Sequence, residues 1–359
     1  MRSVRHLELF SGIGGFRRAF DLLADDIGFF SECIGFSEID QSASSVYKNF
    51  FPIDCELEIG DIVKFTESKE KINHLKGFDI LTGGFPCQAF SMMGYQKGFS
   101  DERGNLFFNI ARILEVKKPR YLLLENVRNL VRHDGGNTFS VIKGKLEDLG
   151  YHVYYDIFNT ANFELAQTRN RVYIFCSLTE MGDGFVFSEE RVRESFVRAP
   201  KKKLLRQKSV LDVLEKDVSE KYFLSEKIKP TILSNGTGGF ASNSEINQIV
   251  ARPLTATMVK MHRACQDNYY SEGFIRSISP DDYLRLEFSK EELAKQRIRK
   301  LTPEEAFALQ GFPKEMAIQA RSIKISEHQL YKEAGNAASV NVIYAILYYL
   351  FVVSNIMEW

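Results

Sequence analysis

The chain of 359 residues lacks four features that would indicate its class directly. Its five cysteines include no Cys-x-x-Cys pair, and such an odd, scattered set argues against a disulfide framework or a thiolate zinc site. Lys plus Arg and Asp plus Glu both number 47, so no excess of positive charge indicates a nucleic-acid ligand. The N-terminus has no signal-peptide core. The longest apolar run, 342–353, is shorter than the roughly 18 residues of a membrane span. We therefore expect a protein of the reducing cytoplasm, with 342–353 forming a buried helix.

The central feature of the sequence is the stretch 79–91, Asp-Ile-Leu-Thr-Gly-Gly-Phe-Pro-Cys-Gln-Ala-Phe-Ser. A short apolar run closed by Gly-Gly and Pro predicts a buried parallel strand that passes into a flexible loop. Ligands of open α/β sheets bind at the carboxyl ends of such strands. A lone cysteine is by residue type more often a small buried side chain than a nucleophile. The role of Cys87 therefore depends on the segments that meet it.

Three strand-like segments near the N-terminus predict a site for an adenosine group. Residues 6–20 form a strand, a glycine turn and a helix, and a second strand ends at Glu38. A carboxylate at this distance from a glycine turn commonly accepts hydrogen bonds from ribose hydroxyls. Asp61 follows a third segment, and two interpretations are equally open: it binds an adenine amino group, or it is a surface turn aspartate. The turn reads Gly-x-Gly-Gly and not the G-x-G-x-x-G of dinucleotide sites, which favours S-adenosyl-L-methionine over NAD.

Polar residues also end two later strands. Glu125 directly follows the apolar run 121–124, which favours a functional role over a solvated charge. Arg169 and Arg171 are two residues apart at the start of another strand, so both side chains are expected on one face and could converge on an anion. Salt bridges within the fold are the alternative for this pair. The polar segment 94–104 has the composition of an active-site lid.

In order along the chain, these motifs resemble those of the DNA cytosine-5 methyltransferases, particularly the bacterial restriction-modification type. The series is Phe-x-Gly-x-Gly-Gly, the Glu38 strand, Gly-Asp-Ile, Gly-Phe-Pro-Cys-Gln, Glu-Asn-Val and Gln-x-Arg-x-Arg. Segments 299–313 and 335–340 resemble the last two motifs of that family. The resemblance runs from Leu7 to about Leu347, apart from 177–298.

The resemblance implies an α/β fold. Its main part would be a Rossmann-like S-adenosylmethionine-dependent methyltransferase domain, formed by 1–180 plus 325–359. A smaller, irregular, β-rich target-recognition domain would occupy 181–324. The final helix would return to the first domain.

The resemblance also implies a covalent mechanism on a flipped-out cytosine of a specific double-stranded DNA sequence. The Cys87 thiolate would attack C6, after which C5 accepts the methyl group. Glu125 would donate near N3, which requires a protonated carboxyl whose pKa burial raises. Arg169 would contact the cytosine O2, and Arg171 would support Glu125 or the fold. S-adenosyl-L-homocysteine would be the product, and no metal is expected.

The resemblance assigns two further groups of residues. Those expected to bind the cofactor are Phe10, Gly12, Gly14, Gly15, Glu38, Ile39, Asp61, Ile62, Phe85, Pro86, Asn336 and Ala337. Those expected to bind DNA are Gln88, Ser91, Lys97, Arg252, Thr255, Thr257, Lys260 and Arg263. The family usually has Thr followed by Leu, Val or Ile in its recognition domain. Thr255-Ala256 and Thr257-Met258 both remain candidates for that position.

The segment 191–208 contains eight Lys or Arg residues and a single acidic residue, Glu194. Two interpretations are equally open. The segment is either a solvated linker or a surface that contacts DNA phosphates.

Two alternatives to a DNA methyltransferase were weighed. A tRNA cytosine-5 methyltransferase usually has a Cys-Phe-Thr element, which this chain lacks, and a shorter recognition segment. A DNA-binding protein without catalytic activity is disfavoured because Cys87 and Glu125 are both present. We expect a bacterial, nucleoid-associated monomer that acts on DNA without a membrane partner. It would protect DNA from a cognate restriction endonuclease without forming a stable complex with it.

Overall fold

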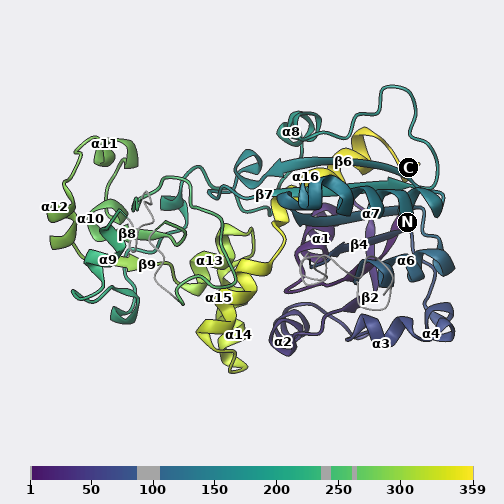
Figure 1. Ribbon diagram of the computed structural model, residues 1–359, viewed down its shortest axis with the longest axis horizontal. Coiled ribbons are helices and arrows are strands. Elements are labelled where there is room, and N and C mark those ends of the chain that lie inside the picture. The colour runs from purple at the N-terminus through teal and green to yellow at the C-terminus, as the bar shows by residue number, and fades with distance from the viewer. Residues whose placement is uncertain (1, 87–105, 236–243, 261–264, 359) are drawn as a thin grey trace. The chain divides into compact units, whose positions relative to one another are not determined.

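The computed structural model describes residues 2–86, 106–235, 244–260 and 265–358 (Figure 1). The chain divides into two compact units, each assembled from separate stretches of sequence. The larger unit comprises Met1–Asn159, Asn170–Leu204 and Val342–Trp359. The smaller unit comprises Thr160–Arg169 and Leu205–Asn341. These bounds differ from the sequence-based division at 180 and 325. The smaller unit takes the segment 325–341 because its helix α15 (Glu327–Asn336) contacts α13 (Pro303–Leu309) and α14 (Lys314–Ser322).

A seven-stranded sheet forms the centre of the larger unit, in the order β3-β2-β1-β4-β5-β7-β6. β1 pairs in parallel with β2 and β4, β2 with β3, and β4 with β5, whereas β7 is antiparallel to both β5 and β6. The strands are β1 (Ser3–Leu9), β2 (Phe30–Ser37), β3 (Leu57–Glu58), β4 (Ile80–Gly84), β5 (Tyr121–Val127), β6 (His152–Asn159) and β7 (Asn170–Ser177). This sheet and the helices on it confirm the predicted α/β class.

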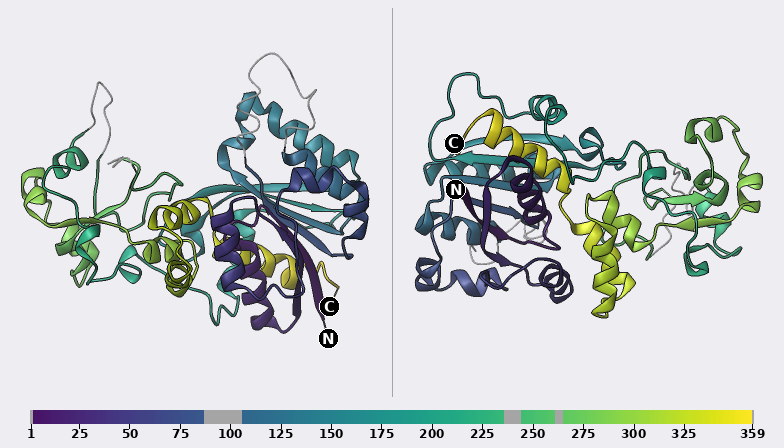
Figure 2. Two further views of the ribbon diagram at one scale, coloured as in Figure 1. Left: turned by 90° about the horizontal axis from the view of Figure 1, so that it is seen from below. Right: turned by 180° about the vertical axis from the view of Figure 1, so that it is seen from behind.

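The central strands are apolar along their length because helices cover both faces of the sheet. On one face, alternate residues of β1, β5 and β7 pack with four helices in a single buried cluster. Those helices are α3 (Ile62–Thr66), α4 (Lys69–His74), α6 (Leu106–Lys117) and α7 (Asn137–Asp148). The opposite face carries α1 (Gly15–Ile27) and α16 (Val340–Tyr348), as Figure 2 shows in purple and yellow. The Phe20 and Phe351 rings of this layer lie 6.0 Å apart. The larger unit also contains α2 (Gln41–Phe50) and α8 (Glu189–Val197).

Close backbone packing fixes the edge at which the central strands end. A Cβ atom on Gly83 of β4 would lie 2.8 Å from the Leu9 carbonyl oxygen of β1. Only glycine therefore permits this spacing, and the carboxyl ends of β1 and β4 lie side by side. The parallel pairing aligns β5 in the same way, with Gly84 opposite Glu125.

The smaller unit consists mainly of short helices and irregular chain. Besides α13, α14 and α15, its described helices are α9 (Lys229–Leu233), α10 (Glu272–Ile275), α11 (Pro280–Leu284) and α12 (Lys290–Lys295). Among its described residues, the extended pairing is a two-stranded sheet of β8 (Tyr269–Ser271) and β9 (Ile298–Lys300). In the described ranges, the β-rich character expected for this domain is limited to that sheet and the isolated bridges Gln167–Ala251 and Phe223–Arg299. Serine N-caps, such as Ser279 and Ser289, begin helices in this unit.

The apolar run 342–353 is helical, and its residues 342–347 and 349–351 are buried, whereas Val352 and Val353 are exposed. Val342, Ile343 and Tyr344 are at most 1% exposed. The helical stretch Glu327–Val353, which is interrupted at 337–339, is long and apolar enough to cross a membrane, yet 72% of its most apolar window is buried inside the protein. Burial in a protein core accounts for its composition.

Candidate active site

The glycine turn after β1 leaves open space beside the backbone. Phe10, Gly12 and Gly14 all have positive φ angles, of 53°, 54° and 86°. A Cβ on Gly14 would lie 2.4 Å from the Phe51 ring, whereas a Cβ on Gly12 would meet nothing within 4 Å. Gly14 is thus required for packing and for its conformation, and Gly12 faces a free volume.

Glu38 links this turn to the end of β2. Its carboxylate accepts hydrogen bonds from the Gly12 N–H and the Asp40 N–H, both at 2.8 Å. Burial raises the pKa of Glu38, and the two backbone N–H donors oppose this shift. The neighbouring Ile39 is 73% exposed, which is unusual for an apolar side chain beside a partly buried carboxylate. The pair presents one polar and one apolar group beside the open turn.

Asp61 and Ile62 lie after β3. Asp61 caps α3, where its carboxylate accepts from the Val63 N–H at 2.9 Å. The Ile62 side chain is 4% exposed and belongs to the buried cluster, so a ligand would meet its backbone. Both assignments to the cofactor stay predictions.

The end of β4 is held by a side chain from β5. Asn126 Nδ2 donates to the Phe85 carbonyl oxygen at 2.8 Å, and its Oδ1 accepts from the Val127 N–H at 2.8 Å. The Phe85 side chain is buried, and Pro86 is exposed. Asn126 therefore fixes the backbone that leads to Cys87. Cys87 itself, Gln88, Ser91 and Lys97 lie outside the described residues.

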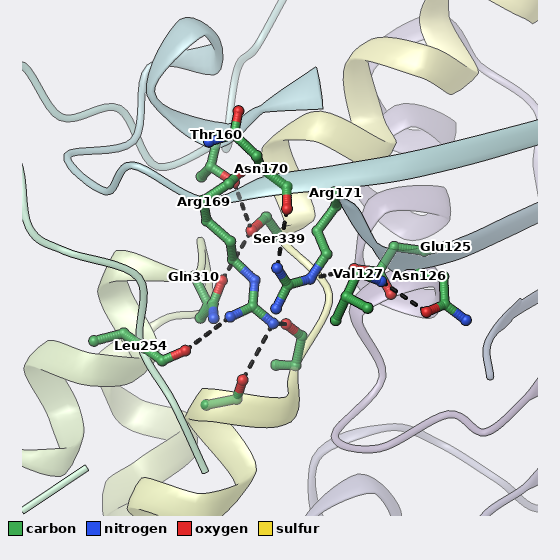
Figure 3. A network of polar contacts seen from close by, with 12 residues as sticks. Glu125, Asn126, Val127, Thr160, Arg169, Asn170, Arg171, Leu254, Gln310 and Ser339 are labelled. Carbon is green, nitrogen blue, oxygen red and sulfur yellow. Dashed lines mark hydrogen bonds and ion pairs between the residues drawn. The ribbon is translucent and has the colours of Figure 1, made fainter. Parts of the chain in front are cut away.

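Glu125 and Arg171 form an ion pair at the same edge of the sheet (Figure 3). Arg171 Nε lies 3.0 Å from Glu125 Oε1, and the two side chains are 19% and 11% exposed. A Cβ on Gly84 would lie 3.3 Å from Glu125 Oε2, so glycine leaves space beside the carboxylate. Arg171 was expected to support Glu125 or the fold, and it contacts Glu125 here; its role in catalysis stays a prediction.

Arg169 has a different set of partners, and the guanidinium hydrogen bonds seen among the described residues go to the smaller unit. Arg169 is 2% exposed, and its guanidinium donates to three backbone carbonyls (Figure 3). Nη1 donates to Leu254 at 2.9 Å, and Nη2 donates to Gly335 and Ala337, both at 3.1 Å. Arg169 directly precedes β7, whereas Arg171 lies within that strand. The expected convergence of the two arginines on an anion stays a prediction.

The remaining assigned residues of the smaller unit lie in two segments. Asn336 is exposed at the end of α15, and Ala337 is buried as its C-cap. Thr257 and Lys260 are exposed, and Thr255 is half-buried. Arg252 donates to the Glu245 carbonyl at 2.8 Å. Arg263 lies outside the described residues.

Much of the basic segment 191–208 contacts acidic residues of the chain itself. Lys203 Nζ lies 2.7 Å from Asp25, and Lys202 donates to Asp26 from both its backbone and its side chain. Arg191 pairs with Glu194, and Arg206 with Glu164. For these residues the structure favours a structural role over either a free linker or a phosphate surface.

Comparison with known proteins identifies the family. The profile of the C-5 cytosine-specific DNA methylases matches residues 4–351. This chain belongs to that family. Among curated relatives, it is 38% identical to the type II methyltransferase M.SsoII of Shigella sonnei, with 95% of this chain and 78% of that protein aligned. It is 35% identical to M.HaeII of Haemophilus aegyptius, over 96% of this chain and 92% of that one.

Solved structures support the fold. The Schizosaccharomyces pombe Dnmt2 methyltransferase superposes with a TM-score of 0.71 at 19% identity, covering 99% of this chain and 100% of that one. Entamoeba histolytica EhMeth gives a TM-score of 0.69 at 20% identity, with 98% of each chain covered. These likenesses concern the fold alone. The family assignment makes this methylase a DNA (cytosine-5)-methyltransferase, and it confirms the resemblance seen in the motif order.

Family membership implies S-adenosylmethionine as the methyl donor, and the residues of this methylase fit that group. The Ser11 hydroxyl is buried and has no hydrogen-bond partner among the described residues. It sits in the turn whose Gly12 faces open space. Together with the exposed Ile39 and the Glu38 carboxylate, the turn offers polar and apolar partners for an adenosine and its attached chain.

The sequence did not single out a buried polar cluster beneath the turn of this methylase. Glu8 of β1 is fully buried, and burial raises its pKa to about 8. Arg17 of α1 pairs with both Asp21 and Glu56, and the Tyr47 hydroxyl donates to Glu8 at 3.5 Å. Glu8 within the apolar run of β1 could have indicated this cluster from the sequence, because a carboxylate buried in a strand needs polar partners.

Proposed function

We propose that this methylase transfers a methyl group from S-adenosyl-L-methionine to C5 of a flipped-out cytosine in a specific double-stranded DNA sequence. The observation that carries the proposal is the Glu125–Arg171 pair at the edge where β4 leads toward Cys87. The Arg171 guanidinium supplies a donor and a positive charge for one face of a base, and the Glu125 carboxyl 3.0 Å away can transfer a proton once it is protonated. Cytosine stacked in a duplex does not expose these atoms, so the base must leave the helix.

The reaction begins with attack of the Cys87 thiolate on C6, which forms a C–S bond and moves the ring electrons toward C5 and N3. A proton at N3, supplied through Glu125, neutralises this charge. The cofactor supplies an electrophilic methyl group, which C5 accepts. Transfer of the C5 proton to a base then expels the Cys87 thiolate, and N3 returns its proton to Glu125, which restores the neutral aromatic ring. Atoms and charge balance because C5 loses one proton for each methyl group gained and Glu125 regains the proton that it gave to N3.

The arrangement of the two arginines assigns them separate roles. Arg171 contacts Glu125, and we assign it to the base, including the O2 contact first expected of Arg169. Arg169 uses its guanidinium on three carbonyls of the smaller unit. Arg169 therefore serves to hold together the segments of the smaller unit that carry these carbonyls.

The wider setting follows from the relatives. The relatives named above are type II methyltransferases, which supports protection of DNA from a cognate restriction endonuclease as the biological role. The protein would act as a monomer in the cytoplasm, and would bind the endonuclease only through their shared DNA site. No metal enters the mechanism. Within the described ranges, no group of three metal-ligating side chains is present.

Trapping on 5-fluorocytosine tests the covalent step. Fluorine at C5 cannot leave as a proton, so the wild-type enzyme with cofactor and a fluorinated duplex should form a stable adduct, detectable by denaturing electrophoresis. Cys87→Ser should bind the same duplex without forming the adduct. An adduct in this variant, or none in the wild type, contradicts the mechanism.

Bisulfite sequencing of plasmid exposed to the enzyme would show which cytosine is modified. Methylation of transcribed tRNA but not of duplex DNA would contradict the proposed substrate.

A further inference from the structure

Two segments of the smaller unit approach each other more closely at Gly335 than any side chain would allow. A Cβ atom on Gly335 would lie 2.2 Å from the Thr255 carbonyl carbon, 2.3 Å from its oxygen and 2.4 Å from the Ala256 nitrogen. All three are backbone atoms, which cannot move aside as the end of a flexible side chain can. The helix α15 therefore rests directly on the backbone of the segment 254–256, which we call the recognition segment.

Buried hydrogen bonds hold the same two segments together. Arg169 Nη1 donates to Leu254 of the recognition segment, and Nη2 donates to Gly335 and Ala337 at the end of α15. One rigid, planar guanidinium thus joins both sides of the contact.

Gln167 adds a second link. Its Oε1 accepts from the Leu254 N–H at 2.9 Å, and its Nε2 donates to the Leu309 carbonyl at 3.0 Å. Gln167 is fully buried, and Leu254 is 2% exposed. We call this arrangement of Gly335, Arg169 and Gln167 the backbone joint.

The joint connects two groups with different assigned tasks. On one side, Thr255 is half-buried against the joint, whereas Thr257 is exposed two residues later. On the other side, Asn336 and Ala337 are the residues assigned to the cofactor. Moving Gly335 away from Thr255 would therefore shift the backbone on both sides at once.

We propose that Gly335 and Arg169 are positioning residues that set the recognition segment in register with the Gly335–Ala337 backbone, and so couple DNA binding to cofactor binding. The inference rests on the proposed function, because it takes these segments as DNA-facing and cofactor-facing. Coupling of this kind is reciprocal, so DNA must raise the affinity for the cofactor product by the same factor that the product raises the affinity for DNA. Of the two candidate threonines, Thr255 is the one whose backbone the joint holds in place.

The test uses the full-length enzyme and three variants. Gly335→Ala introduces the clash, and Arg169→Lys keeps the charge but cannot span three carbonyls from two nitrogens. Gly144→Ala is the matched control, since Gly144 also lies within a helix, α7, and an added Cβ would meet nothing within 4 Å.

The first readout is amide hydrogen exchange over 252–258 without DNA. Because the Leu254 N–H is bonded to Gln167, its exchange should accelerate by about tenfold or more in Gly335→Ala and stay unchanged in Gly144→Ala. This readout needs no catalytic activity, so it is independent of whether the methylase assignment holds.

The second readout is binding and kinetics. The affinity for duplex DNA should be measured with and without S-adenosylhomocysteine, together with KM for DNA and kcat. A positioning role predicts a KM for DNA raised about tenfold and a smaller effect of the product on DNA affinity. If the role is purely structural, kcat falls in proportion to the fraction of active enzyme, while KM and the coupling factor stay unchanged. This result would overturn the inference.

If Gly335→Ala does not fold, the same two measurements on Arg169→Lys decide. A wild-type enzyme without methylation activity would instead contradict the proposed function.

Discussion

Arg171 and Glu125 lie on neighbouring antiparallel strands, with Arg171 Nε 3.0 Å from Glu125 Oε1. The two residues are not directly opposite each other in the sheet. Val127 is opposite Arg171, and Glu125 lies two residues before Val127 on β5. The side chains therefore reach diagonally toward each other along one face of the sheet. This geometry places a positive charge beside the carboxyl at the end of β5.

Replacing either member should reduce catalysis more than stability. Glu125→Gln removes the group that supplies the N3 proton, and we expect kcat to fall by about 10²- to 10⁴-fold. Arg171→Ala should reduce kcat to a similar degree, since it leaves the carboxyl without its partner. Single-turnover methylation of a defined duplex measures both effects. The control is Lys145→Ala, which removes an exposed pair with Glu115, and an equal loss in the control would contradict the assignment.

Asn126→Ala should disconnect the backbone before Cys87 from β5. The substitution leaves the buried Phe85 carbonyl without its donor, which costs about 1–3 kcal/mol. We expect slower formation of the fluorocytosine adduct with cofactor affinity changed less than about twofold. Asn73→Ala in α4 is the control, since its side chain is exposed. Normal adduct kinetics in Asn126→Ala would show that the contact does not position the nucleophile.

Comparing Gly14→Ala with Gly28→Ala distinguishes the cost of backbone strain from the cost of a steric clash. Both have positive φ angles, of 86° and 77°. An added Cβ would strike the Phe51 ring at Gly14 but would meet nothing within 4 Å at Gly28. Gly28→Ala should therefore lose only about 1–2 kcal/mol of backbone strain, and Gly14→Ala clearly more. Urea unfolding of the two variants checks the order, and equal losses would contradict it.

Glu8 should make stability fall as the pH rises. Burial raises its folded pKa from 4.5 to about 8, so the folded state keeps a proton that the unfolded state releases. Stability then declines between about pH 5 and pH 8, and above that range the loss due to Glu8 stays constant.

Charged and titratable groups around Glu8 are Arg17 on α1, Tyr47 on α2, Cys33 on β2 and Glu56. Wild type and Glu8→Gln both contain these groups, so their difference in the free energy of unfolding reports on Glu8. The free energy of unfolding of Glu8→Gln minus that of wild type should rise from pH 5 to pH 8, measured by urea unfolding. A constant difference across this range would contradict the raised pKa. Glu115→Gln, at an exposed position, is the control.

Lys202 and Lys203 should contribute little to DNA affinity, because they contact Asp25 and Asp26. The double variant Lys202→Ala, Lys203→Ala should keep the slope of log affinity against log salt within error of wild type. Fluorescence anisotropy on a duplex at several salt concentrations measures this slope. A decrease of about 0.9 per lysine would show that these residues contact phosphates after all.

Local patterns predicted the features that depend on neighbouring residues. The apolar runs 80–82 and 121–124 form central strands because such runs need cover on both faces. Gly12 and Gly14 form the turn because their positive φ angles suit glycine. In both cases the physical cause lies within a few residues of the pattern.

The partners of the arginines could not be predicted in this way. Arg169 meets Leu254 and Gly335, which are 85 and 166 residues away, and no local spacing encodes such contacts. Arg169 stands directly before the first residue of β7, so the strand pattern alone does not define its surroundings. The requirement for glycine at 335 likewise comes from Thr255, so it is visible only in three dimensions.

The larger unit is assembled from three separate stretches, and its last helix is contributed by residues after 341. During synthesis, the ribosome releases the whole smaller unit before α16 can cover its face of the sheet. Until then that face remains exposed, with Phe20 of α1 lacking its Phe351 neighbour. Completion of the sheet layer is therefore a late, long-range event that should limit the folding rate and favour chaperone engagement of the nascent chain.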